Sequence, residues 1–268
     1  MQQGYYVIRT YESGSVGEKT KFFVPGVRPV RMNREQHRNV KKMEQNEHSA
    51  EKRLARLINA NFRKGDILLG LDYNEEGMQR LYKRALEIRR SMSPDEYVET
   101  EDILREAAEQ ELRCVIRRVK YELSKLGLDP DLMYVAITSD MDGETGESVR
   151  VHHHLIIPEE ALEVFKEKWQ AIGSVEYSPL SAQVDYTPIA AYFIRQVRHT
   201  PDIKKYMSSR NLVRPEPKDR IAIAGSELRV PQGGELLHRN EYKPGRPQYI
   251  RYVLPLEKRN YRPRQKKE

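Results

Sequence analysis

Three consecutive histidines, His152 to His154, stand inside the apolar stretch VRVHHHLII, although the chain has only 7 histidines in 268 residues. The apolar residues around them predict a β-strand. Alternate side chains of a strand share a face, so His152 and His154 should point to one side and His153 to the other. Two imidazoles on one face can chelate a metal ion, and an exposed polar strand face is the alternative reading of the same pattern.

A third metal ligand is expected from the strand that precedes the histidines. Residues 132–140 are β-rich, and the turn-forming segment MDGETGES joins them to the histidine strand, which predicts a β-hairpin. Asp140 ends the first strand and is the predicted carboxylate ligand, with Asp142 behind it; a turn residue is the alternative for Asp140. Two imidazoles and one carboxylate would leave positions on the metal open for a substrate oxygen, the arrangement expected of metal-assisted chemistry on phosphate. A structural zinc site is not expected, because the chain has a single cysteine.

A candidate nucleophile lies in the segment TPIAAYFIRQV, which has the spacing of a helix. Its apolar residues form one continuous arc, and Tyr192 falls outside that arc, near Arg195 and Gln196. A tyrosine beside a cation and an amide can act as a covalent nucleophile while the cation holds a phosphate. A tyrosine half-buried at a helix edge gives the same pattern, and Tyr186 and Tyr206 are rival candidates.

The elements that must position these residues alternate between strand and helix patterns. GDILLGLDY, at 65–73, predicts a buried strand, and helical patterns cover residues 75–90, a stretch that ends near Leu126, and residues 158–173. An antiparallel hairpin in the middle of this order favours an α+β fold over a doubly wound sheet. We therefore expect a central antiparallel sheet that carries the histidines on a central strand, with helices packed on it.

The charge distribution separates the ends of the chain from its middle. The net charge of +7 combines +8 in residues 1–64, −5 in 65–135, −7 in 136–190 and +11 in 191–268. Basic ends suit a polyanion, because each phosphate contact releases counterions, although solubilising tails are an alternative. An acidic middle suits a bound divalent cation, or exposed helix faces.

Three consecutive parts are expected along the chain. Residues 1–60 would form a basic N-terminal arm and helix, residues 61–200 a catalytic domain, and residues 201–268 a basic C-terminal extension. The polar, basic stretch 26–45 has the character of the arm. We expect neither a secretory signal nor a membrane span, because the apolar runs are short. The single cysteine favours a reducing compartment.

The order of these motifs resembles the HUH endonucleases that initiate rolling-circle replication. INANFRKGDILLGLDYNEEG is similar to their first motif region, RVHHHLII to their histidine–bulky–histidine metal motif, and DYTPIAAYFIRQ to their tyrosine motif. MSSRNLVRPEP, at 207–217, is similar to a stretch in replication proteins of bacterial mobile elements and phages, the relatives of the filamentous-phage gene II initiator. The similar blocks span about residues 50–217. The chain departs from the pattern at His153, in the bulky position, and at Arg195, since a lysine often follows the family's tyrosine.

The resemblance implies that His152, His154 and a carboxylate hold Mg²⁺ or Mn²⁺ and that Tyr192 attacks the scissile phosphate, with Arg195 as its helper. It implies single-stranded or hairpin DNA at a replication origin as the substrate. The products would be a 5′-phosphotyrosine link and a free 3′-OH that primes synthesis. A host helicase or polymerase would be a further partner, and the bacterial cytoplasm the compartment.

Three other readings stay open at this point. A relaxase or a single-strand transposase would use the same chemistry on a different DNA target. A non-enzymatic nucleic-acid-binding protein would use its histidines structurally. A metal-dependent hydrolase would activate water and form no covalent adduct.

Overall fold

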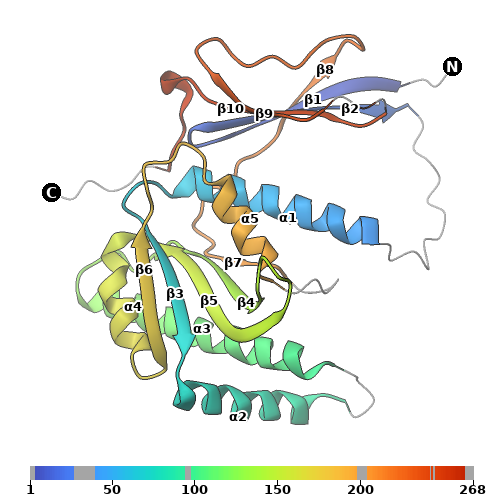
Figure 1. Cartoon of the computed structure of the whole chain (residues 1–268). Coiled ribbons are helices and arrows are strands. Elements are labelled where there is room, and N and C mark those ends of the chain that lie inside the picture. Colours follow the sequence, from blue (N-terminus) through green and yellow to red (C-terminus); the bar gives the residue numbers. More distant parts are fainter. Residues whose placement is uncertain are drawn as a thin grey trace. The chain divides into compact units, whose positions relative to one another are not determined.

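The computed structural model of the chain describes residues 4–26, 40–93, 98–197, 204–241, 243 and 245–262. This described part has an α+β fold with two antiparallel sheets of five strands each, which confirms the predicted fold class (Figure 1). The chain divides into two compact units. The first unit consists of Met1–Asn61, Val184–Pro188 and Val213–Glu268, and the second unit of Phe62–Gln183 and Ile189–Leu212.

The two ends of the chain belong to one unit, whereas the sequence suggested separate terminal parts, 1–60 and 201–268. Strands from both ends pair in a sheet of order β8-β1-β2-β10-β9. Residues 27–39 of the predicted arm and residues 263–268 lie outside the described residues. The strands of this sheet are β1 (Gly4–Ser13), β2 (Val16–Pro25), β8 (Lys218–Ala222), β9 (Glu235–Arg239) and β10 (Gln248–Val253).

Two cationic side chains of helix α1 (Val40–Asn61) pack on aromatic rings of the sheet in the first unit. The Nζ atom of Lys52 lies 3.9 Å from the ring centroid of Tyr249, and the guanidinium of Arg56 lies 3.5 Å from that of Tyr11. Arg56 also donates to both carboxylate oxygens of Glu18, at 3.1 and 2.8 Å. Part of the positive charge near the N-terminus is therefore used inside the fold.

The second unit is built on a sheet of order β6-β3-β5-β4-β7, in which every pair is antiparallel. The histidine strand, β5, lies between β3 and β4, so both the predicted hairpin and the central position of this strand are confirmed (Figure 1). The strands are β3 (Ile67–Tyr73), β4 (Val135–Met141), β5 (Ser148–Ile157), β6 (Gly173–Pro179) and β7 (Met207–Ser208).

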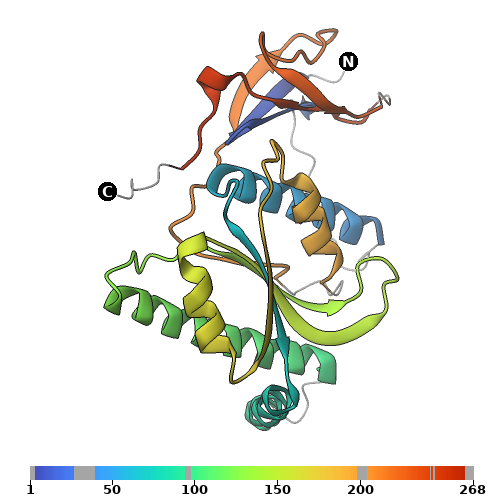
Figure 2. The same cartoon turned by 60° about the vertical axis from the view of Figure 1, so that its left-hand side comes forward.

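Helices cover both faces of this sheet. Helices α2, α3 and α4 lie on one face (Figures 1 and 2). Alternate side chains of β3 and β5, such as Leu71 and Leu155, share a buried core there with Val115 and Trp169. Phe193 of α5 packs on the other face, where its ring stacks at 6.0 Å on that of His154. The helical elements are α2 (Glu75–Ser91), α3 (Thr100–Lys125), η1 (Glu159–Ala161), α4 (Leu162–Trp169), α5 (Thr187–Arg195) and η2 (Leu256–Lys258).

No helix in the described part of the chain is both long enough and apolar enough to cross a membrane.

Candidate active site

His152 and His154 share one face of β5, as the strand pattern predicted. Their rings meet edge to face with centroids 4.9 Å apart, and their Nε2 atoms are 3.2 Å apart. The Nδ1 atom of His152 lies 2.9 Å from the carbonyl oxygen of Arg150. A carbonyl can only accept, so this Nδ1 carries the proton and the Nε2 lone pair of His152 is available to a ligand.

His153 points to the opposite face and is fully buried. Its Nε2 lies 2.7 Å from the Tyr73 hydroxyl and its Nδ1 lies 3.1 Å from the Thr138 hydroxyl. Burial, reinforced by the neighbouring histidines, lowers the pKa of His153 to about 3, so this imidazole is neutral. The middle histidine is therefore a hydrogen-bonded core residue, and only its two neighbours can serve the open face.

Gln196, directly after α5, brings an amide to the histidine pair. Its Oε1 lies 3.0 Å from Nε2 of His154 and 3.1 Å from the Ser139 hydroxyl, which donates to it. The backbone N–H groups of Asp140 and Met141 both donate to the Gln196 carbonyl, at 3.3 Å. Strand β4 thus fixes the backbone and the side chain of this residue beside the histidines.

The three side chains fit a divalent metal ion. Two donor atoms at right angles on an octahedral ion, each about 2.1 Å from it, lie about 3.0 Å apart. Nε2 of His154 is 3.2 Å from His152 Nε2 and 3.0 Å from Gln196 Oε1, which matches that spacing. Burial lowers the pKa of His154 to about 4, so its imidazole is neutral. Gln196 Oε1 can only accept, so Nε2 of His154 carries the ring proton here, and binding a metal through Nε2 requires the tautomer with the proton on Nδ1. The Nε2 atom of Gln196 is buried without a hydrogen-bond partner among the described residues.

Asp140, the predicted third ligand, is not brought to the histidines. Ser139 is the residue of β4 that pairs with His152, and the register shifts between Ser139 and Met141. Asp140 instead lines a cavity of 400 Å³ together with Val151 and residues of α2 and α3. Within the described residues no group of three or more His, Cys, Asp or Glu side chains is placed to hold a metal, so a site here needs the Gln196 amide.

Asp142, not Asp140, has the turn role that the sequence offered as the alternative for Asp140. Its Oδ1 accepts the backbone N–H groups of Glu144 and Thr145, each at 2.8 Å. These two hydrogen bonds lower the pKa of the Asp142 carboxyl group. The side chain therefore shapes the hairpin turn that leads into β5.

Tyr192 lies on α5 beside the histidine pair. Its ring centroid is 5.5 Å from that of His154, and 42% of the residue is exposed, whereas Phe193 next to it is fully buried. The prediction that Tyr192 lies outside the apolar arc is confirmed. Arg195, one turn further along, ends α5 and is exposed.

The rival tyrosines have different surroundings. Tyr186 is 3% exposed, belongs to the first unit, and its backbone N–H donates to the Asn59 side chain at 2.8 Å. Tyr206 is half-buried just before β7.

Two further polar residues share the histidine face, and the sequence did not single them out as ligands. Gln196 was noted only as a neighbour of Tyr192, four residues on. Asp72 of β3 pairs directly with His152 across the strands, and its carboxylate acts to raise the pKa of His154 against the stronger lowering by burial. The spacing of four residues between Tyr192 and Gln196 indicated that Gln196 lies on the same side of the helix as Tyr192. The strand register that places Asp72 beside His152 cannot be read from the sequence.

Comparisons of the chain with protein-family models, with curated proteins and with solved structures found no match.

Proposed function

We propose that the chain is a metal-dependent DNA-cleaving and strand-transferring enzyme of the HUH type that starts rolling-circle replication, with Tyr192 as its nucleophile. The observation that carries this proposal is one group of contacts around His154. Its ring lies 5.5 Å from the exposed Tyr192 ring, and its Nε2 lies 3.2 Å from His152 and 3.0 Å from Gln196. The proposed nucleophile and the proposed metal ligands thus lie within one small, partly exposed area.

The side chains of His152, His154 and Gln196 would hold Mg²⁺ or Mn²⁺. When bound, the ion supplies positive charge that polarises a non-bridging oxygen of the scissile phosphate. The Ser139 hydroxyl, 3.1 Å from Gln196 Oε1, keeps the amide turned toward the histidines. The contact between His152 Nδ1 and the Arg150 carbonyl orients the first imidazole in the same way.

Tyr192 would carry out a transesterification. Its phenolic oxygen forms a bond to phosphorus while the bond from phosphorus to the 3′ oxygen breaks, and this oxygen leaves with a proton as a free 3′-OH. One phosphodiester replaces another, so the step needs no external energy source, and attack by a 3′-OH on the tyrosine link rejoins the strand. Arg195, exposed one turn from Tyr192, would contact the phosphate that Tyr192 attacks.

Under this proposal the substrate is single-stranded or hairpin DNA at a replication origin in the cytoplasm of a bacterial host. A host helicase would expose the template and a host polymerase would extend the new 3′-OH. A relaxase or a single-strand transposase would use the same residues in the same way, and the identity of the cleaved DNA separates these cases.

The test is covalent trapping. The full chain is incubated with Mn²⁺ and a library of single-stranded DNA, denatured, and examined for a protein–DNA adduct whose attached 5′ ends are sequenced. Wild type should form the adduct, Tyr192→Phe should not, and Tyr206→Phe should keep it, with circular dichroism confirming that each variant is folded. Cleavage without an adduct would favour a water-using hydrolase, and binding without cleavage would favour a non-enzymatic binder; either result contradicts the proposal.

A further inference from the structure

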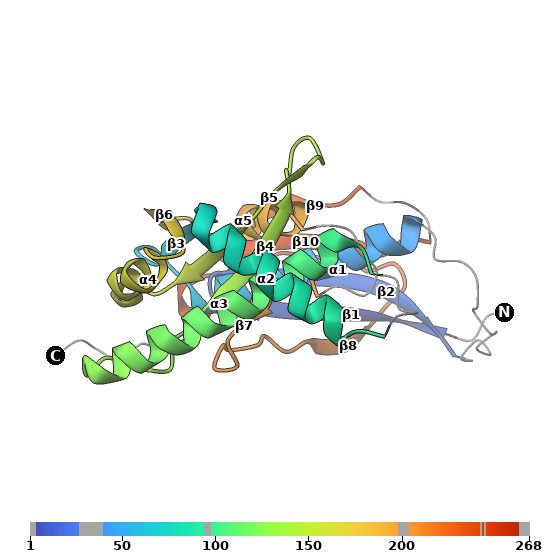
Figure 3. The ribbon, with the colours of Figure 1, turned by 90° about the horizontal axis from the view of Figure 1, so that it is seen from below.

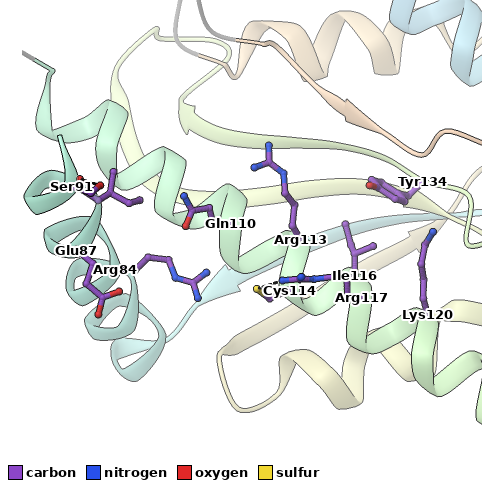
Figure 4. A pocket seen from close by; sticks show the side chains of 11 residues that line it. Arg84, Glu87, Ser91, Gln110, Arg113, Cys114, Ile116, Arg117, Lys120 and Tyr134 are labelled. Atoms are coloured by element: carbon purple, nitrogen blue, oxygen red, sulfur yellow. Dashed lines mark hydrogen bonds between the residues drawn. The ribbon is translucent and has the colours of Figure 1, made fainter. Parts of the chain in front are cut away.

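A groove of 810 Å³ runs between α2 and α3, on the helix side of the second unit's sheet. Figure 3 shows the two helices crossing on the near side of this sheet, and Figure 4 shows the side chains that line the groove. The histidine pair lies on the opposite face of the sheet, so the groove is separate from the candidate active site. It is lined by Arg84, Glu87, Ile88, Ser91, Gln110, Arg113, Cys114, Ile116, Arg117, Lys120 and Tyr134.

The groove is basic because a row of cationic side chains lies along α3. Arg113, Arg117 and Lys120 are spaced four and three residues apart, so they lie along one side of the helix, with steps of about 6 and 4.5 Å along its axis. Arg84 faces them from α2, and Glu87 is the lining residue of opposite charge (Figure 4). A row of this kind can meet several phosphates of one strand in succession.

Two of the four cations that line the groove pair with carboxylates. Arg84 pairs with Glu111 at 3.2 Å, and Arg113 pairs with Glu109 at 2.9 Å.

Arg117 and Lys120, by contrast, form no ion pair within the described ranges; Arg117 donates to the sulfur of Cys114 at 3.0 Å. An anionic ligand in the groove would therefore find two cations that are not already paired with carboxylates.

Tyr134 adds an aromatic surface to this basic groove. It precedes β4, where its N–H donates to the Ser209 hydroxyl at 3.1 Å and its carbonyl accepts the Ser209 N–H at 3.0 Å. These contacts hold the half-buried tyrosine in place at the edge of the sheet. Grooves that combine a track of positive charge with aromatic side chains bind single-stranded nucleic acid, since the cations meet phosphates and the ring stacks on a base.

We propose that this groove binds the backbone of single-stranded DNA. The cation row and the tyrosine carry the assignment to a nucleic-acid strand. That the strand is a flank of the cleaved DNA, outside the scissile phosphate, rests on the proposed function. The groove would then contribute affinity and take no part in the chemical step.

The test compares two double variants of the full chain that change the same helix by the same charge. Arg117→Gln/Lys120→Gln neutralises the groove, and Arg118→Gln/Lys125→Gln neutralises two exposed cations of α3 outside it. Binding of a labelled oligothymidine is measured by fluorescence anisotropy without divalent metal, over a series of salt concentrations. The groove variant should bind about tenfold more weakly and lose about 1.4 from the slope of log affinity against log salt, because each contact to a single strand contributes about 0.7. The control variant should show less than half of the loss in log affinity and less than half of the loss in the salt slope.

Equal losses in the two variants would show a general charge effect and overturn the proposal, as would unchanged binding in the groove variant. A thymidine mononucleotide could also displace the oligothymidine from wild type at a concentration close to the dissociation constant of the oligothymidine. That result would overturn the assignment of the groove to a nucleic-acid strand. If the double variant does not fold, Lys120→Gln and Arg117→Lys replace it; the first should lose about half the effect and the second should keep wild-type binding.

The outcome is independent of catalysis. At saturating DNA with Mn²⁺, the groove variant should form the tyrosine adduct at the wild-type rate. A wild type that binds through the groove but forms no adduct would contradict the proposed function alone. A wild type that forms the adduct while both variants bind normally would contradict the groove alone.

Discussion

Arg251 forms an ion pair with Asp185, with 3.0 Å between Nε and Oδ2. The other carboxylate oxygen, Oδ1, accepts the N–H and the hydroxyl of Thr187, at 2.9 and 2.5 Å, and the Asn59 amide at 3.2 Å. Thr187 is the first residue of α5, so Asp185 caps the helix that carries Tyr192 by accepting its first N–H group. Strand β10, near the C-terminal end of the chain, thereby holds the residue that fixes where this helix begins.

Arg251→Met should lower both the free energy of unfolding and the rate of adduct formation. We expect a loss of about 1–2 kcal/mol, because the pair is largely buried and its removal leaves a carboxylate short of a partner. Arg9→Met is the matched control, because Arg9 lies in the same sheet and forms an exposed ion pair. The side chain of Arg9 is 40% exposed and that of its partner, Asp219, is 42% exposed. The control should lose less than about 1 kcal/mol. Urea unfolding and single-turnover adduct formation measure the two effects, and equal losses in both variants would contradict the capping role.

The pair formed by Tyr73 and His153 should be energetically coupled. Tyr73→Phe leaves a buried imidazole nitrogen without its 2.7 Å contact, and His153→Leu leaves the Tyr73 hydroxyl unpaired. Each change should cost about 1–3 kcal/mol, and the double variant should lose less than the sum. A urea double-mutant cycle gives the coupling energy. If the losses in the free energy of unfolding were additive, the contact with Tyr73 would not stabilise His153 in the core.

Buried tyrosines should make the protein less stable in alkali. Burial raises the pKa of Tyr252 to about 12 and raises the pKa values of Tyr73 and Tyr249 as well. Above about pH 10 the unfolded chain loses these phenolic protons while the folded chain keeps them, so the free energy of unfolding falls as the pH rises. Urea unfolding at increasing pH should show this fall, and Tyr252→Phe should make it shallower. A slope identical to that of wild type would contradict the shifted pKa of Tyr252.

Local patterns predicted most of the second unit. The period-two pattern fixed the faces of His152, His153 and His154, and the helical period placed Phe193 in the core and Tyr192 outside it. The first unit could not be predicted in the same way. Its sheet pairs strands that lie about 200 residues apart, such as Val7 with Ile221, and no local period records such a pairing.

The candidate site shows the same limit on a smaller scale. The sequence located a hairpin, but its turn and its irregular register decide which residue of β4 faces the histidines. Ser139 therefore takes the place expected for Asp140. Gln196 reaches His154 because its carbonyl accepts two N–H groups of β4, and this contact joins segments that are distant in sequence.

A prediction about the proposed metal site follows from the finding that Gln196, and not Asp140, lies beside the histidines. Gln196→Ala should weaken Mn²⁺ binding about tenfold or more, because it removes one of three converging donor atoms. Gln196→Glu should retain tight binding, since the carboxylate keeps an oxygen in the same place and adds a negative charge. Asp140→Asn should bind Mn²⁺ as wild type does, because its side chain lines a cavity on the other side of the sheet. Isothermal titration calorimetry on the folded variants provides the affinities. Weak binding in Asp140→Asn together with normal binding in Gln196→Ala would restore the carboxylate ligand that the sequence suggested and remove the amide from the site.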